Sequence, residues 1–222
     1  MHPMKKVIFA AIASAVVAVA QTPITADSPF KIRYAANLSA PADDVAASDS
    51  SVINISNSGA NGASLFGPGT GAAGNICVSV YAFSPDEQLI SCCSCLVTPN
   101  GLQSLSVTRD LTSNTLTGVA PSAVVIKLLA TLAGTGGSGT DCSMAAAAPG
   151  TPVPGLLAWG TTTHAAPSGW AVTETEFTPA TLSAAETASL SNRCEAIIGN
   201  GSGFGICGSC RAGGLGAKKS PK

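Results

Sequence analysis

Charged side chains are scarce in this chain of 222 residues: Asp, Glu, Lys and Arg together make up 10% of it, against about 25% in an ordinary soluble domain. Aromatic residues make up only 5%. A surface that binds nucleic acid needs clustered Lys and Arg, and the composition argues against one. The only basic cluster is the C-terminal GAKKSPK, which we interpret as part of a flexible, solvated tail over residues 212–222.

Long apolar runs are also few. Two lysines precede an apolar run over residues 7–20, which ends in the small-x-small sequence Ala-Val-Ala. This pattern predicts a secretory signal peptide over residues 1–20, cleaved between Ala20 and Gln21. A membrane-spanning helix needs about 20 apolar residues, and the later run SAVVIKLLATLAG is shorter and contains Lys127. We therefore expect export through a Sec-type pathway, no membrane span after cleavage, and a secreted, extracellular or cell-surface location.

Removal of residues 1–20 from the 222 leaves 202 residues, with nine basic and 12 acidic side chains and a net charge near −3. This length is sufficient for one domain with its own core. We expect an extended N-terminal segment over residues 21–51, a folded domain over residues 52–211, and the basic tail.

Short β-rich segments, separated by Gly, Pro, Asn and Ser, dominate the mature chain. They cover residues 52–56, 75–83, 88–97, 102–107, 123–130, 156–165 and 170–177. Their period of two predicts a mainly β fold, an antiparallel β-sandwich of about seven to nine strands, with a closed barrel as the nearest alternative.

One helix is predicted over residues 183–198, because Ser183 is a good N-cap and Glu186 follows three residues later. Two Gly-rich connections, residues 58–74 and 132–155, interrupt the strands. Connections of this length are usually either functional or disordered.

Eight cysteines remain after signal cleavage, and an even number in an exported chain predicts up to four disulfides. They are Cys77, Cys92, Cys93, Cys95, Cys142, Cys194, Cys207 and Cys210. If residues 84–87 form a four-residue turn, the flanking segments pair as a hairpin. Strand alternation then places Cys93 and Cys95 on one face of the hairpin, and Cys77 and Cys92 on the other.

This placement favours a bridge between Cys77 and Cys92, which are diagonal neighbours on one face. We rank Cys142 with Cys194 second. The GICGSC segment supplies partners for the remaining two: Cys207 and Cys210 pair with Cys93 and Cys95, in either order.

Two other uses of the cysteines are weighed against disulfides. Cys93, Cys95, Cys207 and Cys210 have the paired short spacings of a zinc-thiolate site, but export exposes thiols to oxidation before a metal is loaded. Cys207 and Cys210 have the spacing of a redox CxxC motif, but glycines surround them instead of a βαβ unit. We expect no metal and no cofactor, and keep a zinc-thiolate or thiol redox protein as the second alternative.

No set of residues supports catalysis. His164 is the only histidine beyond the signal peptide, and no G-x-S-x-G motif accompanies it. Glu174 and Glu176 share one strand face, as a glycosidase pair would, but alternating Thr and Glu is also typical of a solvated face, which we favour. The Gly-rich GNGSGFG follows the predicted helix, whereas a phosphate-binding loop precedes one. We therefore expect no enzymatic activity.

Three segments carry a resemblance to known sequences. They are NICVSVYAFSPDEQLISCCSCLVTPNGLQSLSV, EFTPATLSAAE and GNGSGFGICGSCRAGGLG. Together they resemble uncharacterised exported Cys-rich bacterial proteins that combine an SCCxC stretch with a GSGFGICxSC tail. The resemblance implies a bacterial exported protein, and it implies neither an activity nor a catalytic residue.

These observations favour a secreted, disulfide-stabilised structural protein of the cell surface or extracellular matrix. The strand at residues 52–56 and the segment over residues 21–51 have no obvious partner, so we expect self-association by strand addition, into a fibre or layer. The alternative is a carbohydrate- or ligand-binding β-sandwich module. Trp159 and Trp170 are its only candidate platforms for a sugar, and we expect both to lie in the sandwich core.

Overall fold

The computed structural model describes residues 27–36, 38, 51–65, 73–134, 142, 150–208 and 210–212. The predicted signal peptide, its cleavage between Ala20 and Gln21, and the tail beyond residue 212 lie outside these residues. Parts of both Gly-rich connections lie outside them as well.

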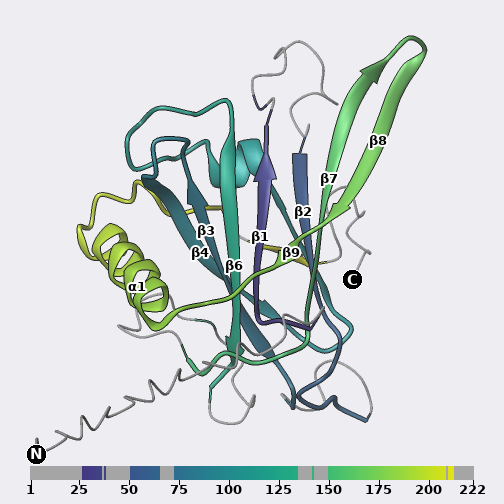
Figure 1. The fold of residues 1–222 in the computed structure, drawn as a ribbon, viewed down its shortest axis with the longest axis vertical. Helices are drawn as coiled ribbons and strands as arrows, with labels where there is room; N and C mark the ends of the chain where they lie inside the picture. Colours follow the sequence, from purple (N-terminus) through teal and green to yellow (C-terminus); the bar gives the residue numbers. More distant parts are fainter. Residues whose placement is uncertain are drawn as a thin grey trace, which may run out of the picture.

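Within the described residues, ten strands form two five-stranded antiparallel sheets (Figure 1). Sheet A has the spatial order β4-β3-β6-β1-β9, and sheet B has the order β10-β5-β2-β7-β8. The strands are β1(Phe30–Ala35), β2(Ser51–Asn57), β3(Ile76–Phe83), β4(Leu89–Val97), β5(Leu102–Ser106), β6(Val124–Leu132), β7(Leu156–Ala166), β8(Gly169–Glu176), β9(Thr178–Pro179) and β10(Arg211–Ala212). The predicted antiparallel β-sandwich is confirmed, and two separate sheets rule out the closed barrel.

The seven β-rich segments of the sequence form β2 to β8. The strands that the sequence did not indicate are β9 and β10, of two residues each, and β1. Strand β1 pairs with β6 along its whole length and with β9 at Lys31 and Ile32. The expectation that residues 21–51 have no partner is therefore wrong, because the sandwich already includes Phe30.

Strand β2 is a central strand of sheet B. It pairs with β5 on one side and with β7 on the other. Its inward side chains, Ile53 and Ile55, are fully buried, and burial of one such side chain stabilises a fold by about 1.5–3 kcal/mol. The expectation that residues 52–56 form an unpaired edge is wrong, since this strand supplies part of the core between the sheets.

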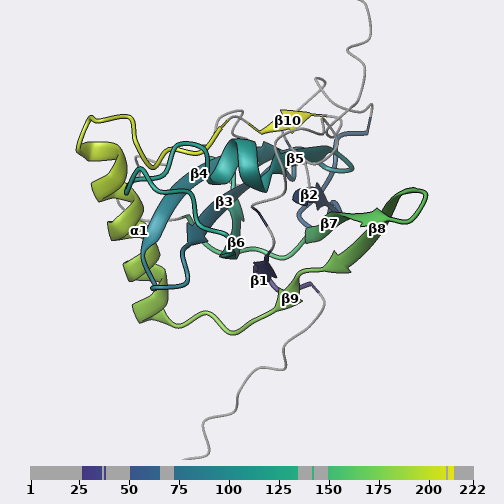
Figure 2. The same ribbon diagram turned by 90° about the horizontal axis from the view of Figure 1, so that it is seen from above.

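Helix α1(Ala184–Gly199) confirms the predicted helix and packs on the outer face of sheet A (Figure 2). The Ser183 hydroxyl accepts a hydrogen bond of 3.0 Å from the backbone N–H of Glu186, which satisfies one otherwise free donor at the start of the helix. Leu190, Cys194 and Ile197 are buried against the sheet. Their cluster also contains Phe30, Tyr81, Phe83, Leu89, Cys92 and Leu129.

The β3–β4 hairpin has a different register from the expected one. Val78 lies opposite Cys95, and Tyr81 lies opposite Cys92, a shift of two residues. The predicted four-residue turn is five residues long, with Ser84 N–H bonded to the Gln88 carbonyl, and a bulge interrupts the ladder at the end of β3. A shift of two residues keeps every side chain on its face, so the predicted faces of the cysteines are right.

The bulge changes the faces of two neighbouring residues. Between Ala82 and Phe83 the pairing skips Ile90. Ile90 therefore faces the core between the sheets, while Leu89 faces α1, the reverse of the assignment that an unbroken alternation gives. An extra residue in one strand has this effect because side-chain direction alternates with every residue.

Candidate functional site

All eight cysteines beyond the predicted signal peptide are paired. The disulfides are Cys77–Cys142, Cys92–Cys194, Cys93–Cys207 and Cys95–Cys210. Four disulfides indicate that the protein folds in an oxidising environment. The predicted link from the GICGSC segment to Cys93 and Cys95 is confirmed, with its order now resolved.

The other two predicted bridges are wrong. In the observed register, Cys77 lies opposite Leu96 and Cys92 lies opposite Tyr81. The two cysteines are thus four positions apart along the ladder, well beyond the roughly 7 Å of Cα separation that a disulfide can span. Cys142 therefore pairs with Cys77, and Cys194 on the helix pairs with Cys92.

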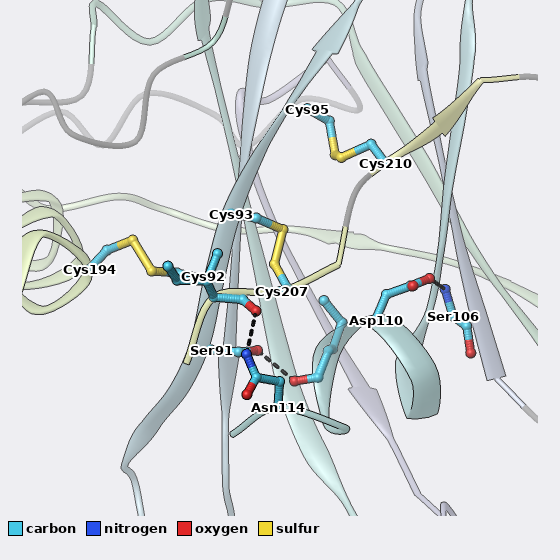
Figure 3. Close-up of a disulfide and its surroundings, with 12 residues drawn as sticks. Ser91, Cys92, Cys93, Cys95, Ser106, Asp110, Asn114, Cys194, Cys207 and Cys210 are labelled. Carbon is cyan, nitrogen blue, oxygen red and sulfur yellow. Dashed lines mark hydrogen bonds between the residues drawn. A yellow bond between two sulfur atoms is a disulfide. The ribbon is translucent and has the colours of Figure 1, made fainter. Parts of the chain in front are cut away.

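The adjacent Cys92 and Cys93 leave β4 in opposite directions (Figure 3). Cys92 points to the outer face of sheet A and binds Cys194 of α1, at a Cα separation of 6.0 Å. Cys93 points to the core between the sheets and binds Cys207, at 5.4 Å. Alternation within one strand thus lets neighbouring residues anchor two different parts of the chain.

The C-terminal strap, residues 203–208, pairs with the free edge of β4 at Cys92. The Cys92 N–H donates to the Gly205 carbonyl at 2.9 Å, and the Cys207 N–H donates to the Cys92 carbonyl at 3.2 Å. Gly205 has φ of +78° and no room for a side chain, because a Cβ there would lie 2.8 Å from Ile197. The GNGSGFG motif is therefore used to cover a strand edge.

A single turn of π-helix, η2(Val107–Leu111), is hydrogen-bonded to the last residue of the strap, Gly208. Asp110 is buried, and its carboxylate accepts a hydrogen bond of 2.6 Å from the backbone N–H of Ser106. The backbone carbonyl of Asp110 accepts a hydrogen bond of 2.8 Å from the Gly208 N–H. This turn was not predicted from the sequence, and the buried carboxylate of Asp110 has a structural role within it.

The zinc-thiolate and redox alternatives require free thiols. In this structure Cys207 and Cys210 bind different partners and not each other. Among the described residues, no group of three or more His, Cys, Asp or Glu side chains is placed to hold a metal ion.

Glu174 and Glu176 lie on β8, where they alternate with Thr173 and Thr175. Glu174 accepts a hydrogen bond of 3.3 Å from the Thr161 hydroxyl. Glu176 lies 4.0 Å from the ammonium group of Lys31. The two carboxylates therefore have different partners, and both are solvent-exposed.

Trp159 is half-buried and lies on the outer face of sheet B, so its predicted place in the core is wrong. Alternation along β7 directs Ala158 and Gly160 inward and hence Trp159 outward. Its neighbours across the sheet are Asn54 and Glu176. His164 lies on β7 and Trp170 on β8, and their side chains lie outside the described part of the structure.

Two cations in β1 face the space between the sheets. Lys31 is fully buried and Arg33 is 8% exposed. Burial lowers the pKa of both groups. For Lys31, the negative charges of Glu176 and, more weakly, Asp27 oppose this effect. This pair was not predicted, and its only signal in the sequence is two basic residues at alternate positions in FKIRYA.

Arg33 has few partners for a buried guanidinium. Its Nη2 donates a hydrogen bond of 2.8 Å to the Thr162 hydroxyl, and its Nη1 has no hydrogen-bond partner among the described residues. Buried polar groups normally have hydrogen-bond partners. The unpartnered nitrogen of Arg33 is therefore a candidate group for binding a ligand.

No protein-family model, curated protein or solved structure matches the chain. None of the helices in the described ranges is both long enough and apolar enough to cross a membrane.

Proposed function

We propose that this is an exported, disulfide-stabilised structural protein of the cell surface or extracellular matrix that self-associates by strand addition at β8. The four disulfides and the low content of charged residues support the location. The observation that carries the proposal is that residues 171–176 of β8 are all exposed at the edge of sheet B.

The other three sheet edges in the described structure are short or covered. Strands β9 and β10 have two residues each, and the edge of β4 is hydrogen-bonded to Leu116 at Ile90, to the C-terminal strap at Cys92 and to the Gln103 side chain at Leu96. Strand β8 has eight residues, and the free end of the β7–β8 hairpin projects beyond the body of the sandwich (Figure 1). It contains neither Lys nor Pro, the residues that commonly protect an edge from pairing.

The ladder between β7 and β8 determines which backbone groups of β8 face outward. Phe177 N–H donates to the Ala158 carbonyl, so Ala158 and Phe177 form a hydrogen-bonded pair. Such pairs alternate along antiparallel strands. Val172 and Glu174, which lie opposite Thr163 and Thr161, therefore direct their N–H and C=O groups away from β7.

A second copy of the chain fits this edge. Two β8 strands that pair antiparallel about Thr173 place Val172 of one copy opposite Glu174 of the other. This register avoids direct opposition of two glutamates, which would be destabilising. Contact between identical edges gives a two-fold dimer, and growth into a layer or fibre requires a second contact.

The substitution Val172→Pro tests the proposal. Proline removes an N–H that faces outward, so it blocks strand addition without loss of a bond to β7. Val172→Thr is the matched control, because it keeps the N–H and changes the side chain at the same position. The mature protein and both variants are compared by sedimentation and light scattering over a concentration series.

We expect wild type and Val172→Thr to associate with rising concentration, and Val172→Pro to stay monomeric with an unchanged thermal midpoint. Association should strengthen with salt, which screens the glutamates of the paired edges. A wild-type protein that remains monomeric at all concentrations contradicts the proposal. Association that Val172→Pro leaves intact contradicts the assignment to β8.

The outer face of sheet B supports a second candidate, a carbohydrate-binding module. A hydrogen-bonded row crosses four strands of this face, from Ser104 through Asn54 and Thr161 to Glu174. Trp159 lies beside it, paired with Asn54. An aromatic ring next to amide, hydroxyl and carboxylate groups is a common arrangement for binding sugars. Retention on a glycan array that Trp159→Ala abolishes would favour this candidate.

A further inference from the structure

The buried guanidinium of Arg33 has no anionic partner among the described residues. Charged groups in protein interiors are normally paired, because the charge loses its hydration and needs compensation. Arg33 has a neutral partner in Thr162, and no carboxylate among the described residues forms an ion pair with it. Burial lowers its pKa, and no charge among the described residues opposes that effect.

The fold makes room for this group. The guanidinium lies over Gly160 of β7, where any side chain would overlap it. Thr175 of β8 lies opposite Gly160 in the ladder and lines a cavity of about 520 Å³. Neighbouring strands are about 4.8 Å apart, so the guanidinium adjoins this cavity, and Arg33 itself contributes to the lining.

The cavity lies where the chain leaves one sheet for the other. Strand β9 pairs with β1 only at Lys31 and Ile32, whereas the preceding β8 belongs to sheet B. The lining is Ile32, Arg33, Tyr34, Thr175, Glu176, Thr178 and Ala180.

We propose that this cavity binds a carboxylate carried on a small hydroxylated body, of the class of the sugar acids, with Arg33 as the partner of the carboxylate. A guanidinium binds a carboxylate through two parallel hydrogen bonds. The volume is within the range of small-molecule sites, about 300–1,000 Å³. This inference does not rest on self-association at β8.

The other residues that line the cavity indicate which groups the ligand carries besides its carboxylate. Tyr34 is 63% exposed and offers a ring face to a sugar. The hydroxyls of Thr175 and Thr178 and the carboxylate of Glu176 are partners for ligand hydroxyl groups. Glu176 also disfavours a ligand with several negative charges, which selects a monocarboxylate.

Binding is tested with probes that separate the two halves of this ligand. Sodium D-galacturonate carries both the carboxylate and the hydroxyls, sodium acetate carries the carboxylate alone, and D-galactose carries the hydroxyls alone. Each is titrated into the full mature protein at constant ionic strength set with sodium chloride, and the thermal midpoint and calorimetric heat are measured. We expect galacturonate to bind about tenfold or more tightly than acetate, the effect of one or two additional hydrogen bonds, and galactose not to bind measurably.

The variant Arg33→Met separates binding from a structural role. An apolar side chain of similar length removes the unpaired charge, so the ligand-free variant should be at least as stable as wild type but should lose its response to galacturonate. Arg193→Gln, which removes an exposed arginine from α1, is the matched control and should respond as wild type does.

Three results would overturn the proposal. They are equal responses to galacturonate and galactose, a galacturonate response that persists in Arg33→Met, and no response of wild type beyond that to sodium chloride. The variant Asp43→Asn/Asp44→Asn tests whether acidic residues that follow β1 in the sequence supply the anion instead. If these substitutions allow wild-type Arg33 to bind galacturonate for the first time, the anion comes from the chain itself and the proposal is wrong.

Discussion

Tyr81 is a residue whose burial links the stability of the protein to alkaline pH. It is 2% exposed, beneath α1 on the outer face of sheet A. Burial raises the pKa of its phenol, and a hydrogen bond with Ser79 opposes part of this effect. An unfolded tyrosine ionises near pH 10. As pH rises through about 10, the unfolded chain therefore releases a proton that the folded state retains, which favours unfolding.

We expect the free energy of unfolding of wild type to fall above about pH 10 relative to that of Tyr81→Phe. The variant loses the ionisable group but keeps the ring, so the difference between the two proteins should grow with pH. Urea denaturation at a series of pH values measures it, with Tyr34→Phe at an exposed position as the control for removal of a hydroxyl. A constant difference across the series would contradict this account.

The direction of individual side chains was predicted correctly at some positions and not at others. Alternation correctly placed Cys92 and Cys93 on opposite faces, because any even shift of register preserves the face. It reversed Leu89 and Ile90, because the bulge at the end of the hairpin shifts the register there and strand alternation alone does not reveal a bulge. The inward direction of Lys31 and Arg33 was not predicted, because two cations at alternate positions normally face solvent.

At the scale of elements, α1 is attached to sheet A by three different kinds of contact. Its apolar face packs on the sheet, Cys194 is bonded to Cys92, and Glu186 forms an ion pair of 2.5 Å with Lys127 of β6. Lys127 also lies 4.8 Å from the centre of the Phe83 ring. The helix was predictable because its N-cap and its apolar spacing are local signals, whereas its position depends on contacts with residues far away in the sequence.

The double variant Cys92→Ser/Cys194→Ser should lower the free energy of unfolding by about 2–5 kcal/mol, since it removes a link across a sequence separation of 102 residues. Hydrogen exchange should increase most over α1, because the apolar face and the ion pair alone then hold it. The matched control is Cys93→Ser/Cys207→Ser, which removes a bridge of separation 114 from the strap. Equal exchange of α1 in the two variants would show that the disulfide does not position the helix.

At the scale of the whole molecule, neither sheet is made from one continuous part of the chain. The chain enters sheet A with β1, passes to sheet B with β2, and returns to sheet A with β3 and β4. It changes sheets again at β5, β6, β7, β9 and β10. Prediction from sequence identified the fold class because alternation reports on each strand separately. It could not assign strands to sheets, since that order depends on contacts between distant segments.

This topology predicts that the two sheets unfold together. Each sheet buries its inner face only against the other, and three of the disulfides join residues more than 100 positions apart, so neither sheet is stable alone. In Trp170→Phe the fluorescence of Trp159 reports on sheet B, and amide exchange in β3 reports on sheet A. Under non-reducing conditions both should give the same urea midpoint, and reduction should lower both midpoints equally, because each lost bridge removes about 2–4 kcal/mol from one cooperative unit. Two separate midpoints would show that one sheet persists without the other.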